Sequence, residues 1–452
     1  MQRLSPPNLA SESLCKAMNL RFSIGCGESV NVTIPDRCLL GVLKPDIAPP
    51  SFYVERAIND AVTMAIEYIP QNILLQKAMK ICIVIPDKTR ILPIKTTLSL
   101  MLQLLYQKRK SYKNIFGIIA TGTHPPLNEY EIEQLIGEAI CKKIPIINHV
   151  WKEENELVFL GNCEIGASII PVYINRLAHE ADVLIGIGSV RPHRAVGWSG
   201  GAKIVIPGIA GKLTIDAWHW AGWNFSRDQI LGEVANPMRL MIERVADEAG
   251  LSAVVNFVMN SCNQPIAVFG GNYVEVHRQA VRVAEQIFSI QVEERADVVI
   301  VGSNPAAGTM WSSVEGIQIA YDIIKKGGTI ILLASCCQGV APEMPEVLHY
   351  GYLLPPSEIR ARVESGEFKD IVVAGHLMYV SEVLHNAAVE CVVVSEQKNK
   401  PGIEKLGLTY ARSPEQALKY VFQKHGKRCK IWALPMYAPG LLIVKNSGGI
   451  YD

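Results

Sequence analysis

The chain repeats one local pattern: a short apolar, largely β-branched run, then a polar or glycine-rich turn, then a stretch with helical periodicity. In the first half these runs cover residues 81–85, 115–120, 144–147 and 183–187. In the second half they cover residues 298–301, 329–333, 371–373, 392–394 and 430–433. Continuous apolar runs of this length are typical of strands buried on both faces, as in parallel sheets covered by helices. The pattern predicts an α/β fold with mainly parallel sheets.

The length of the chain, 452 residues, favours more than one domain, because a single hydrophobic core stops growing at a smaller size. Between the two series of runs lies a largely helical stretch, about residues 237–291, which is interrupted near 253–260 and 265–271. We predict two α/β domains, residues 1–289 and 290–452, with the active site in the cleft between them.

Composition argues against several classes of protein. A net charge of +1 gives no indication of a nucleic-acid partner. The first residues lack the apolar region of a secretory signal, and no apolar run reaches the ~20 residues of a membrane helix. The 11 cysteines form no C-x-x-C motif, which favours reduced, buried thiols over a disulfide framework or a zinc site. We expect a cytoplasmic protein that binds neither nucleic acid nor membranes.

Ionisable side chains follow three of the first-half strands. Asp87 and Arg90 follow one run, His124 the next, and His193 the last. Because ligands bind beyond the carboxyl ends of parallel strands, we predict that these side chains share one site. Arg90 suits bidentate capture of a carboxylate or phosphate. Simpler interpretations stay open, since Asp87 could cap a helix and a single histidine in a turn is more often structural.

A glycine-rich segment, GWSGGAK at residues 197–203, invites comparison with a Walker A loop. Ala202 stands where that motif requires glycine, and Ile204 replaces its magnesium-binding hydroxyl, so an ATPase is not supported. The glycines still offer backbone N–H groups to a phosphate, and Lys203 would be a phosphate contact or a covalent anchor. Taken alone, His219, which lies between two tryptophans, is best interpreted as a half-buried structural histidine.

Together, these motifs resemble those of one known family. The matching segments are DKTR at 87–90, TGTHPP at 121–126, RPH at 191–193, GWSGGAK at 197–203, PGI at 207–209, and the histidine at 219. The set is similar to that of the nickel-pincer nucleotide-dependent lactate racemases, and the similarity extends from about residue 82 to the last strands. The resemblance implies an isomerase, a racemase or epimerase of a 2-hydroxy acid, that works by reversible hydride transfer.

The resemblance also implies a cofactor, pyridinium-3,5-bisthiocarboxylic acid mononucleotide carrying Ni(II), which a thioamide attaches to Lys203. His219 would complete the nickel coordination, in keeping with the square-planar preference of Ni(II). Further cofactor contacts are implied at Asp87, Thr89, Ser199, Gly200 and Gly201. Proteins that mature the cofactor are the implied partners.

His124 and His193 match the two acid/base histidines of the family, and Arg90 matches a contact of the substrate carboxylate. Two bases are needed because the 2-hydroxyl lies on opposite sides in the two antipodes. An imidazole, with an ordinary pKa of about 6.5, can take or give a proton near neutral pH. Since the hydride returns to the same molecule, no external nicotinamide is implied.

The second half departs from the family pattern. Lactate racemases have a Tyr-Gln-x-x-Lys pattern where this chain reads WSSVE at residues 311–315, so Ser312 replaces glutamine and Glu315 replaces lysine. An anion there would repel a carboxylate, and Ser312 leaves room. We therefore expect a larger or polyhydroxylated 2-hydroxy acid rather than lactate. Tyr379 is a further candidate for the substrate site, and a core tyrosine is an equally good interpretation.

Two other functions stay open. A nickel-pincer cofactor-binding protein without racemase activity would need only Lys203 and His219, so the presence of His124 and His193 favours an enzyme. An unrelated phosphate-ligand enzyme would use residues 197–203 as an anion cradle, and it would carry neither nickel nor an adduct on Lys203.

Overall fold

The computed structural model describes residues 16–44, 53–76, 78–260, 262–305, 307–368, 370–435 and 442–445. These residues divide into two compact units. The first unit contains the described residues from 53 to 290, and the second contains residues 16–44 together with those from 291 to 435. Two short strands, β14 (Ser289–Val292) and β20 (Leu442–Lys445), pair with each other.

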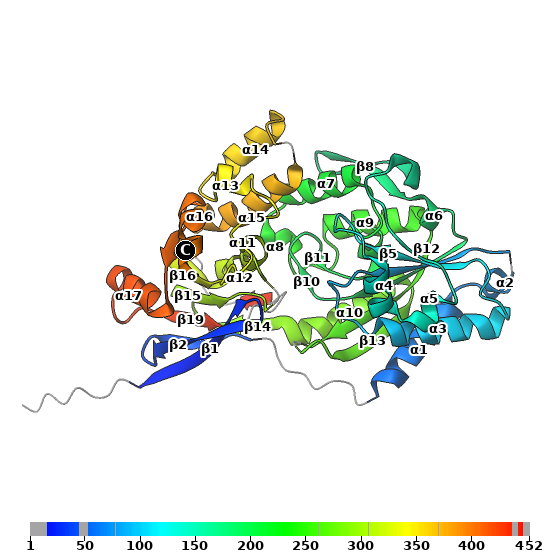
Figure 1. The fold of residues 1–452 in the computed structure, drawn as a ribbon, viewed down its shortest axis with the longest axis horizontal. Coiled ribbons are helices and arrows are strands. Elements are labelled where there is room, and N and C mark those ends of the chain that lie inside the picture. Colours follow the sequence, from blue (N-terminus) through cyan, green and yellow to red (C-terminus); the bar gives the residue numbers. More distant parts are fainter. Residues whose placement is uncertain are drawn as a thin grey trace, which may run out of the picture. The chain divides into compact units, whose positions relative to one another are not determined.

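The first unit is built on a six-stranded sheet with the strand order β13-β12-β9-β4-β5-β6 (Figure 1). The strands are β4 (Ile81–Pro86), β5 (Ile115–Ala120), β6 (Ile146–Asn148), β9 (Val183–Ser189), β12 (Leu251–Met259) and β13 (Pro265–Gly271). All neighbours are parallel except β12 and β13. The four strands predicted in this half are therefore present. The two interruptions of the helical stretch are β12 and β13, which complete the sheet.

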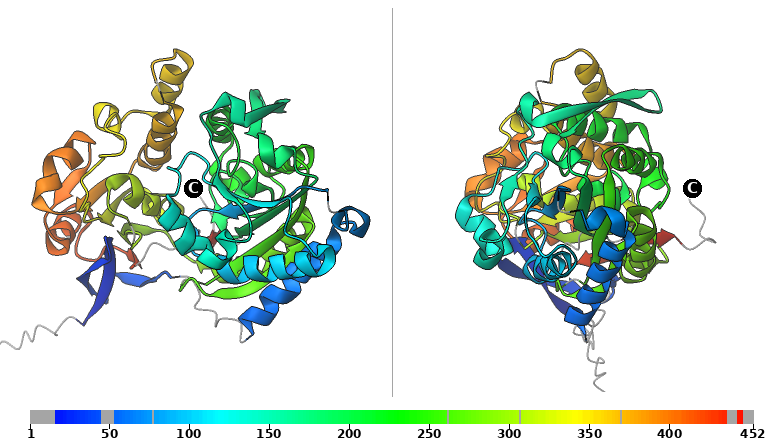
Figure 2. Two further views of the ribbon diagram at one scale, coloured as in Figure 1. Left: turned by 45° about the vertical axis from the view of Figure 1, so that its right-hand side comes forward. Right: turned by 90° about the vertical axis from the view of Figure 1, so that its right-hand side faces the viewer.

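Helices cover both faces of this sheet (Figures 1 and 2). The longer ones are α1 (Val54–Tyr68), α3 (Ile94–Arg109), α4 (Glu129–Ile136), α7 (Lys212–Ala221), α9 (Pro237–Glu248) and α10 (Tyr273–Phe288). Every residue of β4 is buried. Ile83 and Ile85 join a core formed with α1 and α3, whereas Val84 joins a core that contains Trp218 of α7 and Val245 of α9. Alternate side chains thus enter opposite cores, as the continuous apolar pattern predicts.

Shorter elements complete the first unit. The hairpins are β7 (Leu157–Ile165) with β8 (Ser168–Asn175), and β10 (Pro192–His193) with β11 (Gly197–Trp198). The short helices are α2 (Gln71–Leu74), α5 (Glu138–Cys141), α6 (Arg176–His179), α8 (Arg227–Ile230) and the 3-10 turns η1 (Glu154–Glu156), η2 (Gly201–Ile204) and η3 (Gly222–Asn224).

The second unit has a six-stranded sheet of its own, with the order β18-β17-β16-β15-β19-β3 and all neighbours parallel. Its strands are β3 (Leu39–Val42), β15 (Ala296–Gly302), β16 (Ile324–Leu333), β17 (Glu390–Val394), β18 (Thr409–Ala411) and β19 (Ile431–Leu434), beside the hairpin β1 (Ala17–Gly25) and β2 (Glu28–Pro35). Its helices are α11 (Met310–Ser313), α12 (Glu315–Ile323), α13 (Val347–Tyr350), α14 (Pro356–Glu364), α15 (Ile371–Asn386), η4 (Gln397–Asn399), α16 (Lys400–Lys405) and α17 (Pro414–His425). The α/β class with mainly parallel sheets is confirmed.

One predicted strand is wrong. Residues 371–373 form the first turn of α15, where the Asp370 side chain accepts a hydrogen bond from the Val372 N–H at 3.0 Å. Leu377, Val380 and Leu384 are buried farther along at helical spacing, so this apolar run begins a buried helix. A short apolar run in a sequence therefore does not distinguish a buried strand from the start of a buried helix.

The predicted N-terminal domain, residues 1–289, is wrong at its start. Strand β3 pairs in parallel with β19, with Leu39 opposite Ile431, so residues 16–44 belong to the second unit. No local pattern reveals which of two parallel sheets a short strand will join. The other predicted boundary, near residue 290, coincides with the division between the units.

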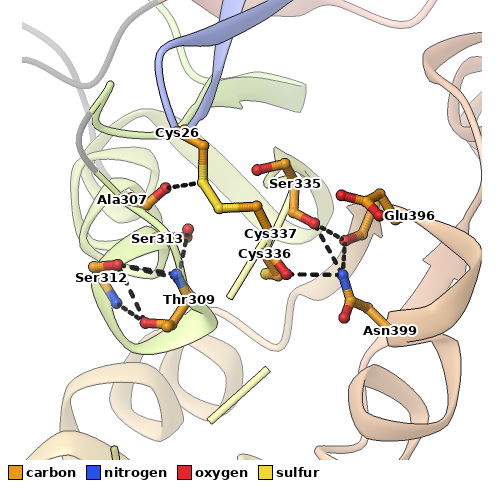
Figure 3. The surroundings of a disulfide bond; sticks show 12 residues. Cys26, Ala307, Thr309, Ser312, Ser313, Ser335, Cys336, Cys337, Glu396 and Asn399 are labelled. Atoms are coloured by element: carbon orange, nitrogen blue, oxygen red, sulfur yellow. Dashed lines mark hydrogen bonds between the residues drawn. A yellow bond between two sulfur atoms is a disulfide. The ribbon is translucent and has the colours of Figure 1, made fainter. Parts of the chain in front are cut away.

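A disulfide joins Cys26, at the turn of the β1–β2 hairpin, to Cys337, in the loop after β16 (Figure 3). The expectation of reduced thiols throughout is wrong at this pair, whose members are 311 residues apart in the sequence. Other described cysteines are free, and most of them are buried. Among the described residues, no helix combines the length and the apolar character that spanning a membrane requires.

Candidate active site

A pocket of about 260 Å³ lies in the first unit, where β4, β5 and β9 end. Asp87 enters its wall directly after β4, His124 after β5 and His193 after β9. Lys203 of η2 and His219 of α7 line the same pocket. The side chains that the sequence placed at separate strand ends are therefore brought together, as expected for the carboxyl edge of a parallel sheet.

Asp87 and His124 form a hydrogen-bonded pair in the wall of the pocket. His124 Nδ1 lies 2.6 Å from Asp87 Oδ2. The other carboxylate oxygen accepts from the Thr89 hydroxyl at 2.5 Å and from the Thr89 backbone N–H at 3.2 Å. Asp87 is buried, whereas the His124 side chain is exposed. The carboxylate thus holds one ring nitrogen of His124 and leaves the other available to a ligand.

The charge of Asp87 is stabilised by these contacts. Burial alone would raise its pKa, but the hydrogen bonds from His124 and Thr89, together with the charges of His124 and Arg90, outweigh burial and lower the pKa. The ionised carboxylate fixes the orientation of the His124 ring through the hydrogen bond at Nδ1. This is the arrangement of a base supported by a carboxylate.

His193 lies in the β10–β11 hairpin, opposite Gly197. Its Nδ1 accepts a hydrogen bond from the Ala195 backbone N–H at 3.2 Å. Burial, and then the positive charges of Lys203 and Arg90, lower the pKa of His193 well below its ordinary value. The ring is therefore neutral at neutral pH.

His219 is oriented by its own helix. Its Nδ1 donates to the Ile215 carbonyl at 2.9 Å, and its ring contacts Trp218 edge-on with the centroids 4.7 Å apart. Surrounding protein atoms and the charge of Lys203 lower the pKa of His219 to about 4, although the ring keeps contact with solvent through the pocket. A neutral imidazole with Nδ1 protonated presents the Nε2 lone pair, which is the form that binds a metal.

Lys203 is half-buried, and among the described residues none lies within ion-pair or hydrogen-bonding distance of its amine. Burial, and then the charges of Arg90, Arg191 and Arg239, lower its pKa well below the ordinary value of a lysine, while Asp87 opposes the effect. A lysine in such surroundings is a neutral amine over a wider pH range than an exposed one, and a neutral amine is nucleophilic.

Comparisons with known proteins find lactate racemases by sequence and the fold of a lactate racemase by structure. The model of the lactate racemase N-terminal domain matches residues 26–230. The lactate racemase of Thermoanaerobacterium thermosaccharolyticum is 26% identical over 412 residues, which cover 89% of this chain and 94% of that protein. The lactate racemase of Lactiplantibacillus plantarum is 25% identical, over 78% of this chain and 83% of that protein.

The chain is therefore similar to lactate racemases over most of its length. The fold agrees: the lactate racemase apoprotein from T. thermosaccharolyticum superposes with a TM-score of 0.81, over 95% of this chain and all of that one, at 24% identity. A protein from Thermotoga maritima superposes with a TM-score of 0.66 over 87% of this chain and 98% of that one, at 20% identity. The similarity to these relatives supports a racemase-like function.

The glycine-rich segment at residues 197–203 is packed closely against its neighbours. Gly200 and Gly201 have left-handed backbones, with φ of 79° and 55°, and a Cβ on Gly200 would lie 2.4 Å from Asn256 Oδ1. The Gly201 N–H donates to that same oxygen at 2.8 Å. The Ser199 hydroxyl donates to the Ser189 carbonyl at 2.8 Å. The Gly201 N–H is therefore already used by Asn256, and Gly201 does not line the pocket, whereas Ser199 and Gly200 do. Cofactor contacts by this segment stay a prediction.

Arg239 supports this segment from behind, and the sequence analysis missed it. It is fully buried in α9 and donates to the carbonyls of Trp198 and Gly200, the latter at 3.0 Å. Glu243 faces it one turn along the helix and pairs with Arg278 at 2.7 Å. The available signal was a charged residue between the apolar positions Met238, Met241 and Ile242.

The predicted substrate contacts of the second half lie in the second unit. Ser312 lies in α11, and its hydroxyl donates to the carbonyl of Thr309, the residue before this helix, at 3.2 Å. Glu315 opens α12, and Tyr379 lies in α15, where its carbonyl accepts from the Gln318 amide. Among the described residues, those that line the pocket all come from the first unit. Substrate binding by Ser312, Glu315 and Tyr379, like an active site between the domains, stays a prediction.

The residues of the pocket suit a metal ion that is already coordinated by a bound organic group. Among the described residues, no group of three or more histidine, cysteine or acidic side chains is arranged to hold a metal ion. His219 Nε2 alone would be a weak metal ligand, but it suffices for a metal that a bound organic group already coordinates. The unpartnered Lys203 amine in the same pocket is a suitable attachment point for such a group.

Proposed function

We propose that this chain is a racemase or epimerase of a 2-hydroxy acid, which uses a nickel-pincer nucleotide attached to Lys203. The observation that carries the proposal is that Lys203, His219, His124 and His193 line one pocket. An amine, a metal-type imidazole and two further imidazoles together are what a tethered metal cofactor and a proton-transfer reaction require.

Lys203 and His219 would hold the cofactor. The low pKa of Lys203 favours the neutral amine that must react to form a thioamide. The hydrogen bond from His219 Nδ1 to Ile215 directs the Nε2 lone pair toward a metal. When bound, the pincer nucleotide supplies a centre that accepts a hydride from the substrate α-carbon and returns it.

The other residues would bind the substrate and move its proton. His124, backed by the carboxylate of Asp87, would take the proton of the 2-hydroxyl, and Asp87 would stabilise the resulting imidazolium. Arg90 lines the same pocket and would bind the substrate carboxylate through its guanidinium.

The substrate would be larger or more hydroxylated than lactate. Glu315 and Ser312 replace a lysine and a glutamine of the lactate racemase pattern, which removes a cation for a small acid and adds an acceptor for extra hydroxyls. Tyr379 would be a further contact. We infer cofactor maturation proteins as partners, and the cytoplasm as the location. The Cys26–Cys337 bond weighs against a reducing compartment, so cell fractionation is the test.

The test is production of the full chain with and without the cofactor maturation proteins. Intact-mass spectrometry, nickel analysis and chiral chromatography of a panel of 2-hydroxy acids are then compared. We expect an adduct that Lys203→Ala removes and Lys212→Ala keeps, since Lys212 is paired with Asp216 at 2.7 Å on the helix that follows.

The outcomes separate the alternatives. Adduct, nickel and turnover together support the racemase. Adduct and nickel without turnover of any acid indicate a cofactor-binding protein, a reading that the Asp87–His124 pair argues against because storage does not need it. Absence of adduct and nickel from matured protein would overturn the proposal and favour a phosphate-ligand enzyme.

A further inference from the structure

We propose that His124 and His193 carry their protons on opposite ring nitrogens in the resting protein, and that Asp87 is the positioning residue that sets His124. His124 is then ready to take a proton, whereas His193 is ready only to donate a hydrogen bond. The catalytic consequence rests on the proposed function; the tautomers themselves do not.

The assignment for His124 follows from its partner. An ionised carboxylate only accepts hydrogen bonds, so the 2.6 Å contact with Asp87 Oδ2 requires a proton on His124 Nδ1. In the neutral ring Nε2 then carries the lone pair. When Nε2 takes a proton, the Nδ1–H bond to Asp87 is kept, and the carboxylate faces the new positive charge.

The assignment for His193 is the reverse. Its Nδ1 accepts from the Ala195 backbone N–H at 3.2 Å, and a backbone amide can only donate. Nδ1 therefore carries the lone pair, and the proton of the neutral ring lies on Nε2. A neutral imidazole in this state can polarise a substrate oxygen through Nε2–H, but giving up that proton would convert the ring to an imidazolate, which is unfavourable.

The two histidines are consequently unequal in the two directions of reaction. The antipode whose 2-hydroxyl faces His124 can be deprotonated directly; a proton that His193 Nε2 gives to the product oxygen is replaced from solvent, and His124 releases its proton to solvent. The other antipode needs His193 to release the Ala195 contact and move its ring proton to Nδ1 before Nε2 can accept. For a pair of enantiomers the equilibrium constant is 1 by symmetry, so kcat/KM must be equal in both directions. The inequality therefore has to be seen in kcat and KM separately.

The contacts of Thr89 make the substitution Asp87→Asn a direct test of the two tautomers. The Thr89 backbone N–H and the Thr89 hydroxyl both donate to Asp87 Oδ1. In Asp87→Asn the amide oxygen must face the Thr89 N–H, because two donors would otherwise meet. The amide NH₂ then faces His124 Nδ1, which has to become an acceptor. We expect the substitution to switch His124 to the Nε2–H tautomer while the shape of the site is kept.

The experiment uses the metal-free full chain, labelled with ¹⁵N-histidine, at about pH 9, where unperturbed imidazoles are neutral. Long-range ¹H–¹⁵N spectra distinguish protonated from unprotonated ring nitrogens, and His124→Gln and His193→Gln assign the two rings. We expect Nδ1–H at His124, Nε2–H at His193, and Nε2–H at His124 in Asp87→Asn. Asp182→Asn is the matched control, because Asp182 accepts a backbone N–H, from Lys80 at 2.8 Å, elsewhere in the unit.

The same tautomer at both rings of the unmodified protein would overturn the proposal, even if Asp87→Asn did not fold. An unchanged His124 in a folded Asp87→Asn protein would overturn the role of Asp87. Neither result depends on nickel, so a failure here is distinguishable from a failure to load the cofactor or to turn over a hydroxy acid. With matured enzyme, kcat that differs between antipodes at equal kcat/KM supports the inequality.

Discussion

The buried guanidinium of Arg239 donates to the carbonyl of Gly200 at 3.0 Å, three residues before the proposed anchor Lys203. It also donates to the Trp198 carbonyl. An arginine with no surface exposure thus satisfies the backbone of the segment that carries the reactive amine. The position of Lys203 depends on a charged group that takes no part in the chemistry.

Replacing this arginine should be costly. Arg239→Met leaves two buried carbonyls without donors and removes a cation near Glu243, so we expect the free energy of unfolding to fall by about 3 kcal/mol. Arg244→Met is the control on the same helix, because its pair with Glu248 is exposed and worth under about 1 kcal/mol. Urea denaturation followed by fluorescence measures both. Equal effects of the two substitutions would contradict the assigned role.

His193→Ala should abolish interconversion and leave the cofactor adduct intact. Its Nε2 faces the substrate site in the proposed mechanism, while the anchor and the metal-type imidazole belong to Lys203 and His219. Loss of a positioned acid/base group lowers turnover by about 10²–10⁴-fold. Chiral chromatography gives the rate and intact mass gives the adduct. Turnover within a few-fold of the unmodified enzyme would exclude a catalytic role for His193.

Acid should destabilise the protein through His149. This histidine is 2% exposed, its Nε2 donates to the Ala210 carbonyl at 2.9 Å, and burial lowers its pKa to about 4. Between that value and the unfolded value of about 6.5, the unfolded state binds the proton and the folded state does not, so the free energy of unfolding falls with falling pH. The total loss is about 3 kcal/mol. His149→Gln should flatten the pH dependence between about pH 6.5 and 4; an unchanged slope would show that other groups cause it.

Breaking the disulfide should weaken the second unit. Cys26→Ser opens a bond that closes a loop of 311 residues, and the expected loss of stability is about 2–5 kcal/mol under oxidising conditions. Cys262→Ser is the control, because Cys262 is exposed and free. Adding a reductant should bring the unmodified protein to the stability of Cys26→Ser. If the reductant has no effect on the unmodified protein, the bond does not stabilise it.

Glu315→Lys tests the proposed choice of substrate. A cation restored at this position should raise turnover of lactate and lower turnover of the native acid, because it attracts a small carboxylate and removes an acceptor. Glu404→Lys is a control in the same unit, where Glu404 lies 3.8 Å from Lys400 in an exposed pair. Lactate and the hydroxy-acid panel are assayed together. No change in either rate would mean that Glu315 is not the counterpart of the family lysine.

The position of the candidate site could be predicted because apolar runs and the ionisable residues after them are visible in the sequence, and the sites of parallel sheets lie at a known edge. Buried apolar runs identified β4, β5 and β9, and parallel sheets collect ligands at their carboxyl edge, so Asp87, His124 and His193 were expected together. The same reasoning did not reveal that the Gly201 N–H donates to the side-chain oxygen of Asn256. A glycine required by backbone conformation and one required by a ligand are identical in a sequence.

Long-range features could not be predicted for a physical reason. The pairing of β3 with β19, the Cys26–Cys337 bond and the contact of Arg239 with Gly200 each join residues that are distant in the chain. Their partners are determined by tertiary packing, and neither composition nor spacing contains that information. The direction of the ring protons of His124 and His193 is likewise a property of neighbours that only the fold supplies.

The membership of β3 in the second sheet has a consequence for biosynthesis. Residues 39–42 leave the ribosome early, whereas their partner β19 (Ile431–Leu434) lies among the last described residues to be synthesised. The whole first unit is translated in between, and it can fold as soon as it emerges. The apolar side chains of the hairpin and of β3 therefore remain exposed until β19 has been synthesised, and this is the interval in which a chaperone would be most useful.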